Sequence, residues 1–168
     1  MSKIEYTKRF ELRPFSLDDA GHLFHLDNNE AVHRYLGQNP VKDINQSVKI
    51  VEDLLQQYKN NGIGRWAIFR KEDGRFLGWS GLKLEDEGYY DIGYRLLPEF
   101  WGQGIAFETA TFWLDYGFKT LNLPDIIGDA HIGNIASNKV LRKIGLKYRH
   151  HLYWNGIMCN RYGLKNPY

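Results

Sequence analysis

Three short strand-like runs follow one another between residues 65 and 97, and they constrain the fold more than any other feature of the sequence. The runs are RWAIFRK, RFLGWSGLKL and YYDIGYRLL, at residues 65–71, 75–84 and 89–97. The turn signal Asp73-Gly74 separates the first two, and residues 85–88 separate the second and third. Because short turns join antiparallel neighbours, we predict an antiparallel meander in the middle of the chain.

The segments around the meander predict helices before it and alternating elements after it. Residues 9–15 are typical of a first strand, and helical stripes at 17–24 and 44–58 follow. After the meander we expect a helix over 107–121, an extended piece at 125–131, a helix at 134–146 and a hairpin around Asn155-Gly156. The chain is therefore predicted to form one α/β (α+β) domain over residues 1–168. Its mixed, mostly antiparallel sheet of six to seven strands would have helices on both faces.

The composition argues against several classes of partner. The chain has 168 residues and a net charge of +2, from 22 basic and 20 acidic side chains, so we expect neither nucleic acid nor a membrane as partner. No stretch approaches transmembrane length and no apolar leader is visible, which makes the cytoplasm the expected location. The six histidines and the acids show no metal-ligand spacing, so no metal is expected. The single cysteine, Cys159, is expected to be an ordinary buried thiol rather than a nucleophile.

Two glycines lie where the helix after the meander should begin, in the stretch PEFWGQGIAFE at residues 98–108. Glycines at a strand-to-helix junction leave the first helical N–H groups free, and these groups form an anion site. A plain turn is the alternative interpretation, and for an isolated G-x-G it is the better one. The P-loop pattern is absent, and Phe107 stands where a dinucleotide fingerprint needs its third glycine.

Taken together with NIASNKVLRKIGL at residues 134–146, the stretch YRLLPEFWGQGIAFE at 94–108 resembles the GNAT N-acetyltransferase superfamily. It is most similar to the subgroup that contains the ribosomal-protein N-terminal acetyltransferases. The resemblance covers roughly residues 9–164, because the order of elements also fits. Trp101 departs from the Gln or Arg that opens the general loop pattern, although an aromatic residue is common there in this subgroup.

The resemblance implies an acetyl-CoA cleft. Backbone amides of the loop would hold the pyrophosphate, and the pantetheine arm would pair with the fourth strand, which splays from the fifth. Asn134 and Ser137 would face the pantetheine and the sulfur, although Asn134 is equally suited to cap its helix. The implied cofactor-binding residues are Leu96, Leu97, Trp101, Gly102, Gln103, Gly104, Ile105, Ala106, Asn134 and Ser137.

The resemblance leaves the proton-transfer groups open. Leu141 occupies the position of the tyrosine that protonates the leaving thiolate in many members, so Ser137 is the candidate acid here. A general base is needed because an amine of pKa about 8 or above is mostly protonated near neutrality. The candidates are Asp91, Asp129 and His131, the last two sharing one strand face. Glu108 is expected to complement the helix dipole rather than react.

The sequence thus predicts an acetyl-CoA-dependent N-acetyltransferase that acts on a primary amine by direct transfer. The acceptor would be a protein N-terminus or a small molecule, and the resemblance also admits a homodimer. No acyl-enzyme is expected, since no Cys or Ser has triad-like partners. A non-catalytic CoA-binding regulatory domain is the alternative. A nucleic-acid-binding domain is the least favoured hypothesis, since no basic stripe is visible.

Overall fold

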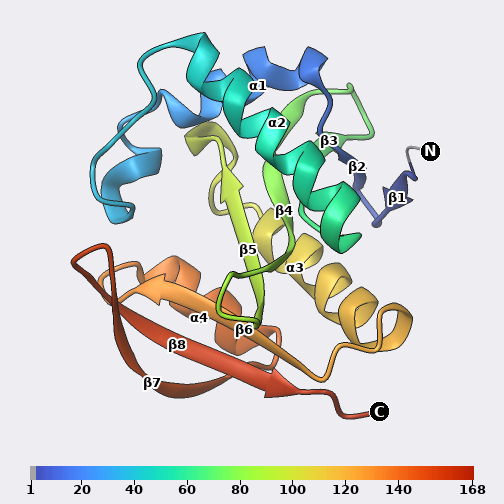
Figure 1. The fold of residues 1–168 in the computed structure, drawn as a ribbon, viewed down its shortest axis with the longest axis vertical. Helices are drawn as coiled ribbons and strands as arrows, with labels where there is room; N and C mark the ends of the chain where they lie inside the picture. Colours follow the sequence, from blue (N-terminus) through green and yellow to red (C-terminus); the bar gives the residue numbers. More distant parts are fainter. Residues whose placement is uncertain (1–2) are drawn as a thin grey trace.

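The computed structural model describes residues 3–168 as an eight-stranded sheet with helices packed on it (Figure 1). The N-terminal half contains β1 (Glu5–Tyr6), β2 (Phe10–Pro14), a 3-10 turn (Leu17–Asp19), α1 (Ala20–Asp27), a second 3-10 turn (Val32–Tyr35) and α2 (Ile44–Asn61). The central meander is β3 (Arg65–Arg70), β4 (Phe76–Leu84) and β5 (Tyr90–Leu96). A 3-10 turn (Pro98–Phe100), α3 (Ile105–Asp115) with a π-helical end (Tyr116–Thr120), β6 (Asp125–His131), α4 (Ile135–Lys143), β7 (Lys147–Trp154) and β8 (Ile157–Lys165) follow.

The strand order is β1-β2-β3-β4-β5-β6-β8-β7, and every neighbouring pair is antiparallel except β5 and β6. The predicted meander and the C-terminal hairpin are confirmed. Asn155 and Gly156 have φ of 47° and 76°, as a tight two-residue turn requires. The sheet has one strand more than the predicted six to seven, because β1 pairs with β2 through two residues, too short to show an alternating pattern.

Helices cover both faces of the sheet, as predicted. Figure 1 shows α1 and α2 on one side, while α3 lies behind β4 and β5 with α4 next to it. The α2 helix begins where Asp43 accepts a hydrogen bond from the backbone of Asn45 and ends at Gly62, whose φ of 71° suits glycine. No helix within residues 3–168 is both long and apolar enough to span a membrane.

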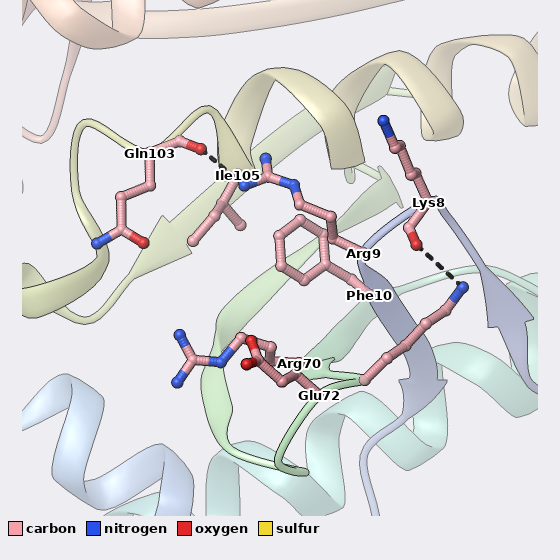
Figure 2. Close-up of a pocket in the computed structure, with 8 residues that line it drawn as sticks. Lys8, Arg9, Phe10, Arg70, Glu72, Gln103 and Ile105 are labelled. Atoms are coloured by element: carbon pink, nitrogen blue, oxygen red, sulfur yellow. Dashed lines mark hydrogen bonds between the residues drawn. The ribbon is translucent and has the colours of Figure 1, made fainter.

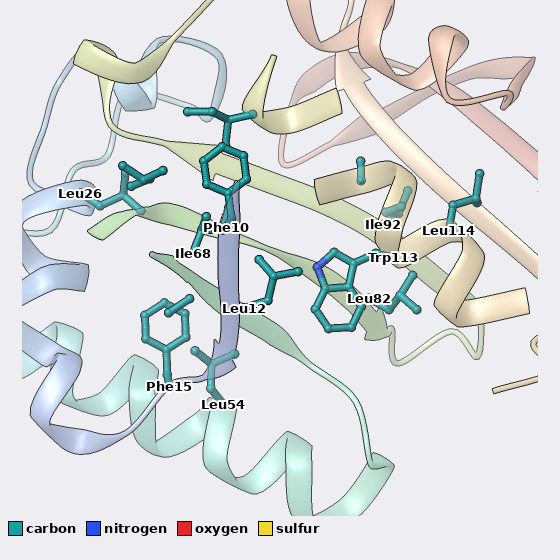
Figure 3. Close-up of a cluster of buried hydrophobic side chains, with 14 of the residues drawn as sticks. Phe10, Leu12, Phe15, Leu26, Leu54, Ile68, Leu82, Ile92, Trp113 and Leu114 are labelled. Atoms are coloured by element: carbon teal, nitrogen blue, oxygen red, sulfur yellow. The ribbon is translucent and has the colours of Figure 1, made fainter. Parts of the chain in front are cut away.

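The hydrophobic core lies between the N-terminal strands and the helices (Figure 3). Phe10, Leu12 and Ile68 of β2 and β3 are almost completely buried together with Trp113 of α3. Each such side chain contributes about 1.5–3 kcal/mol through removal from water. The Trp113 Nε1 donates a hydrogen bond to the Ser80 Oγ at 2.9 Å, so the one polar atom of this ring is satisfied in the core. The core therefore fixes α3 against β4.

β5 and β6 are adjacent only at one end. β4 pairs with β5 at seven positions and β6 pairs with β8 at seven, but β5 and β6 share the single pair Asp91↔Ile127. Beyond Asp91 the two strands part. The Leu97 N–H donates to the Leu77 carbonyl of β4 at 2.9 Å, so by alternation the backbone groups of Tyr94 and Leu96 face the gap. The expected splay is therefore present between the fourth and fifth of the strands predicted from the sequence.

Candidate active site

The loop between β5 and α3 presents a row of free backbone donors. Gly102 and Gly104 have φ of 73° and 75°, the left-handed conformation that glycine adopts without cost. Left-handed residues alternating with ordinary ones make a concave nest of N–H groups. The first helical bond of α3 runs from the Glu108 N–H to the Gly104 carbonyl at 3.0 Å, and the N–H groups of residues 102–107 have no acceptor among residues 3–168. Together with the positive end of the helix dipole they form an anion site.

Two side chains of the loop hold it against the end of β5. The Trp101 Nε1 donates to the Leu96 carbonyl at 2.9 Å, and the Gln103 Nε2 donates to the Glu99 carbonyl at 3.2 Å. The Trp101 ring is half exposed and lines the cavity described next. Leu97, by contrast, is buried and its N–H is bonded to β4, so of these two predicted residues Leu96 is the one whose N–H faces the gap. The structure thus places the predicted strand donor at Leu96 and not at Leu97.

A cavity of about 950 Å³ connects this loop with the gap between β5 and β6. It reaches from Gly102, Gly104, Ile105 and Ala106 at the loop, past Leu96, Asn134 and Ser137, to Asp91, Asp129 and His131. Of the residues predicted to form the site, only Leu97 and Gln103 do not line it. The cavity therefore brings the loop, the N-terminus of α4 and the acidic residues of β5 and β6 into one space.

The wall on the α4 side is held by side-chain bonds. The Asn134 side chain accepts from the Ser137 N–H at 3.1 Å and so caps α4, as one of the two interpretations predicted. The Tyr94 hydroxyl lies 3.0 Å from the Ser137 carbonyl and 3.1 Å from the Ser137 Oγ. Burial raises the pKa of Tyr94 well above its ordinary value, which keeps this phenol protonated. Tyr94 was not identified from the sequence, since nothing in the local pattern of a strand indicates which helix it will reach.

Asn138 is a second residue that sequence reasoning missed. It is buried, and its Nδ2 donates to the carbonyls of His131 at 2.9 Å and Asn134 at 2.7 Å. Its Oδ1 accepts from the Tyr162 hydroxyl and the Asn160 Nδ2, each at 2.8 Å. All its hydrogen-bonding capacity is used, so Asn138 fixes the start of α4 against β6 and β8. A polar residue on the inner side of an amphipathic helix is the sequence signal that could have found it.

The opposite face of β5 carries the first acid. Arg95 pairs with Asp27 of α1 at 2.8 Å, so by alternation Asp91 also points to the side of α1 and α2, whereas Tyr94 points to α4. Asp91 forms an ion pair with Arg65, whose Nη1 also donates to the Gly81 carbonyl at 2.6 Å. Burial raises the pKa of Asp91 to about 6, although Arg65 opposes the shift. A carboxylate of this pKa is ionised at neutral pH and can accept a proton.

Asp129 and His131 extend this face along β6. Both Asp129 oxygens accept from Arg161, at 2.9 and 2.7 Å, and the Arg161 Nη2 also donates to the Tyr89 hydroxyl at 3.1 Å. The His131 Nδ1 accepts from the Gly133 N–H at 2.8 Å, so in the neutral ring the hydrogen resides on Nε2. The His131 Nδ1 is therefore occupied, and Asp129 has both oxygens in an ion pair.

The structure also shows the environments of three other residues that the sequence analysis discussed. Leu141 is buried with 1% of its surface exposed and forms part of the inner cavity wall. Cys159 is buried in β8, where burial raises the pKa of its thiol, as expected of an unreactive cysteine. Glu108 accepts hydrogen bonds from Thr7 and Arg9, which ties the first turn of α3 to the N-terminal strands.

Comparison with known proteins decides the family. The family profile described as "Acetyltransferase (GNAT) domain" matches residues 9–147, most of the chain. The chain belongs to the GNAT acetyltransferase family. The predicted resemblance is confirmed, and with it the classification as an acetyl-CoA-dependent N-acetyltransferase.

Individual relatives agree. The uncharacterized N-acetyltransferase YoaA of Bacillus subtilis (strain 168) is 30% identical over 175 residues, covering 99% of both chains. The spermidine N(1)-acetyltransferase of Escherichia coli (strain K12) is 26% identical and covers 89% of this chain and 81% of its own length. Among solved structures, the ribosomal L7/L12 alpha-N-protein acetyltransferase RimL in complex with coenzyme A superposes with a TM-score of 0.84 at 20% identity, over 97% of this chain and 98% of the other. This last likeness shows a shared fold.

The residues present fit acetyl-CoA. The free amides of residues 102–107 suit a pyrophosphate, because they supply several donors and a positive helix terminus without requiring a charged side chain. The backbone of Tyr94 and the N–H of Leu96 face the gap and suit an amide-bearing arm, which can add to a strand edge. Bound acetyl-CoA would supply an acetyl group activated as a thioester, and side chains of the protein would accept and donate the protons.

Proposed function

We propose that the protein transfers an acetyl group from acetyl-CoA directly to a primary amine, with the two substrates entering the cavity from opposite faces of β5. The observation that carries this proposal is the division of polar groups about β5. Tyr94 and Ser137 lie on the α4 side, at 3.1 Å from each other, and Asp91 lies on the side of α1 and α2. The cavity connects the free amides of the α3 loop with Tyr94 and Ser137.

Asp91 is the proposed general base. Its side chain is 15% exposed, it lines the cavity, and its pKa is raised to about 6, which suits proton removal from an amine near neutral pH. Asp129 is less suited, because both its oxygens accept from Arg161. His131 is less suited because its unprotonated nitrogen accepts from Gly133 and its Nε2 carries the hydrogen. In the reaction, Asp91 takes the proton that the attacking amine loses, directly or through a water.

Ser137 is the proposed acid for the departing sulfur. The single hydroxyl hydrogen of Tyr94 can be donated to the Ser137 carbonyl or to the Ser137 Oγ; when the Oγ accepts it, the hydrogen of Ser137 is free to be donated into the cavity. Tyr94 stays protonated and acts as a positioning residue for this hydroxyl. The demand on Ser137 is modest, because a thiol of pKa about 8.5 is a good leaving group near neutrality.

The charges of the cavity favour an acceptor with one amine over a polyamine. Asp91, Asp129 and Glu85 are each held by a cation, the last by Lys83 at 2.8 Å. Among the acids that line the cavity, Glu87 is the one without an ion pair in residues 3–168. One lining cation, Arg34, likewise has no ion pair in those residues, so the free charges of the lining are one of each sign. A polycation needs an excess of negative charge, which this wall does not provide. A peptide N-terminus or a small monoamine is therefore the proposed acceptor class.

An acceptor screen tests the proposal. The purified protein would be incubated with acetyl-CoA and a panel of short peptides with free N-termini, monoamines and spermidine, and both thiol release and acetylated product would be measured. We expect turnover with peptides or monoamines that exceeds turnover with spermidine. Thiol release without an acetylated amine would contradict the function, and spermidine as the best acceptor would contradict the assignment of the acceptor class.

A further inference from the structure

Outside the cavity, one arginine touches the loop that the function requires. Arg9 of the β1–β2 connection lies in a second hollow, of about 420 Å³, between β2, β3 and the start of α3 (Figure 2). Its Nη1 donates to the Gln103 carbonyl at 3.0 Å, the contact drawn as a dashed line in Figure 2. Its Nε donates to the Glu108 Oε2 at 2.7 Å, and its backbone N–H donates to the Glu108 Oε1 at 2.9 Å. Arg9 therefore joins the loop to the first turn of α3 from outside the cavity.

We propose that Arg9 is a positioning residue for pyrophosphate binding, because its bond to the Gln103 carbonyl turns the Gly104 N–H into the cavity. In a trans peptide the C=O of one residue and the N–H of the next point in opposite directions. Arg9 holds the Gln103 oxygen on the outer side, where Gln103 lines the hollow of Arg9, while Gly104 lines the cavity. This inference rests on the proposed function, which places the pyrophosphate at these amides.

The peptide needs such a restraint because of its neighbours. Rotation of the Gln103–Gly104 peptide changes the ψ of Gln103 and the φ of Gly104, and glycine has the widest choice of backbone conformations. Without an outer partner, the peptide is free to rotate and present its carbonyl oxygen to the cavity, where it would repel a phosphate. One bond from Arg9 selects the orientation that offers a donor.

Glu108 holds the arginine itself. It accepts from the Thr7 hydroxyl at 2.7 Å as well as from Arg9, so the Arg9 guanidinium is fixed at Nε while Nη1 donates to the loop. Partial burial alone would raise the pKa of Glu108, but its bonds to Arg9 and Thr7 keep the pKa below its ordinary value. Glu108 thus remains ionised at neutral pH and keeps the arginine in place. The Glu108 side chain is linked to the loop through Arg9.

The alternative is that Arg9 attracts phosphate simply by its charge, and its neighbour Lys8 controls for this. Lys8 lines the same hollow, and its side chain contacts no loop residue in the described part of the chain. We would prepare Arg9→Gln, Arg9→Lys and Lys8→Gln and measure dissociation constants by calorimetry. The ligands would be CoA, dephospho-CoA, which retains the pyrophosphate but lacks the 3′-phosphate, and pantetheine, which lacks both.

We expect Arg9→Gln to weaken CoA and dephospho-CoA equally, by about 10-fold, the value of one hydrogen bond from a charged donor. Pantetheine binding should be unchanged, and Lys8→Gln should match the wild type with every ligand. Arg9→Lys should show the same loss of affinity as Arg9→Gln while keeping the wild-type melting temperature. The lysine ammonium can pair with Glu108, but unlike the arginine guanidinium it cannot also donate to the Gln103 carbonyl.

Three results would overturn the inference. These are unchanged CoA affinity in Arg9→Gln, a loss confined to CoA that would indicate contact with the 3′-phosphate, and an equal loss for pantetheine that would indicate general distortion. Failure of the proposed function would look different, since the wild-type protein would then not bind CoA tightly or would yield no acetylated amine.

Discussion

The two faces of β5 at the splay consist of different kinds of chemical group. On the α4 side, the site consists of backbone amides of residues 102–107, a capped helix and the Tyr94–Ser137 pair. On the side of α1 and α2, it consists of ion pairs that join distant elements. Arg65 of β3 meets Asp91 of β5, and Arg161 of β8 meets Asp129 of β6.

This difference matches the roles proposed for the two faces, in which the α4 side is the cofactor face and the side of α1 and α2 is the acceptor face. A pyrophosphate and a pantetheine arm are the same in every acetyl-CoA, so fixed backbone groups suffice to bind them. An acceptor varies from enzyme to enzyme, and side chains from several elements can change without altering the fold. Mutations should therefore separate into those that change acetyl-CoA affinity and those that change turnover.

The largest effect is expected on the acceptor face. Asp91→Asn removes the proposed base and should lower kcat by about 10²- to 10⁴-fold, the usual contribution of a general base. The dissociation constant of acetyl-CoA, measured by calorimetry, should not change, since Asp91 is not on the α4 side. If Asp91→Asn were active while Asp129→Asn were inactive, the base would be Asp129 and the assignment would be wrong.

The pH dependence of kcat/KM gives an independent measure of the same group. Asp91 must be ionised to act, so activity should fall as the pH drops through about 6, the raised pKa of this carboxyl. With a peptide whose α-amine has a pKa of about 8, log kcat/KM should rise with a slope of one above pH 6 and a slope of two below it. A slope of one throughout would show that no group of this pKa takes part.

The next largest effect is expected on the cofactor face. Gly104→Val places a β-branched residue at a φ of 75°, a conformation that costs about 1–3 kcal/mol, so the loop should rearrange. The dissociation constant of acetyl-CoA should rise by about 10-fold or more, while the circular dichroism spectrum stays that of the folded protein. Unchanged affinity would mean that the anion is not bound at these amides.

The smallest effects are expected for the proposed proton donor. Ser137→Ala should lower kcat by about 10-fold, because the thiolate is already a good leaving group. Tyr94→Phe should lower it by about 3-fold through loss of one orienting hydrogen bond. Measured as single-turnover thiol release, the order should be wild type, then Tyr94→Phe, then Ser137→Ala. A slower Tyr94→Phe than Ser137→Ala would assign the proton to the phenol instead.

The fold, the geometry of the α3 loop and the cap of α4 could be predicted because their signals are local. Three strands joined by short turns predict a meander, and glycines before a helix predict free amides. The Asn155-Gly156 turn and the Asn134 cap likewise depend on neighbouring residues. The exception was Leu97, where a shift of one residue changes which side of the strand the N–H faces.

The acceptor face and the supports of the loop could not be predicted, because their contacts are made between distant residues. Arg65 and Asp91 are 26 residues apart, and Arg9 and Gln103 are 94 apart. The hydrogen bonds of Asn138 to Tyr162 and Asn160 could not be predicted for the same reason. The sequence identifies the type of each residue, and only the fold decides which partner it meets.

The initial-velocity pattern with varied acetyl-CoA and acceptor tests the central claim most directly, because Cys159 lines the cavity and is the thiol that a covalent mechanism would have to use. Direct transfer across β5 requires both substrates at once and predicts lines that intersect in a double-reciprocal plot. Protein incubated with acetyl-CoA alone should keep its mass. Parallel lines, together with an acetylated protein in the mass spectrum, would contradict the account.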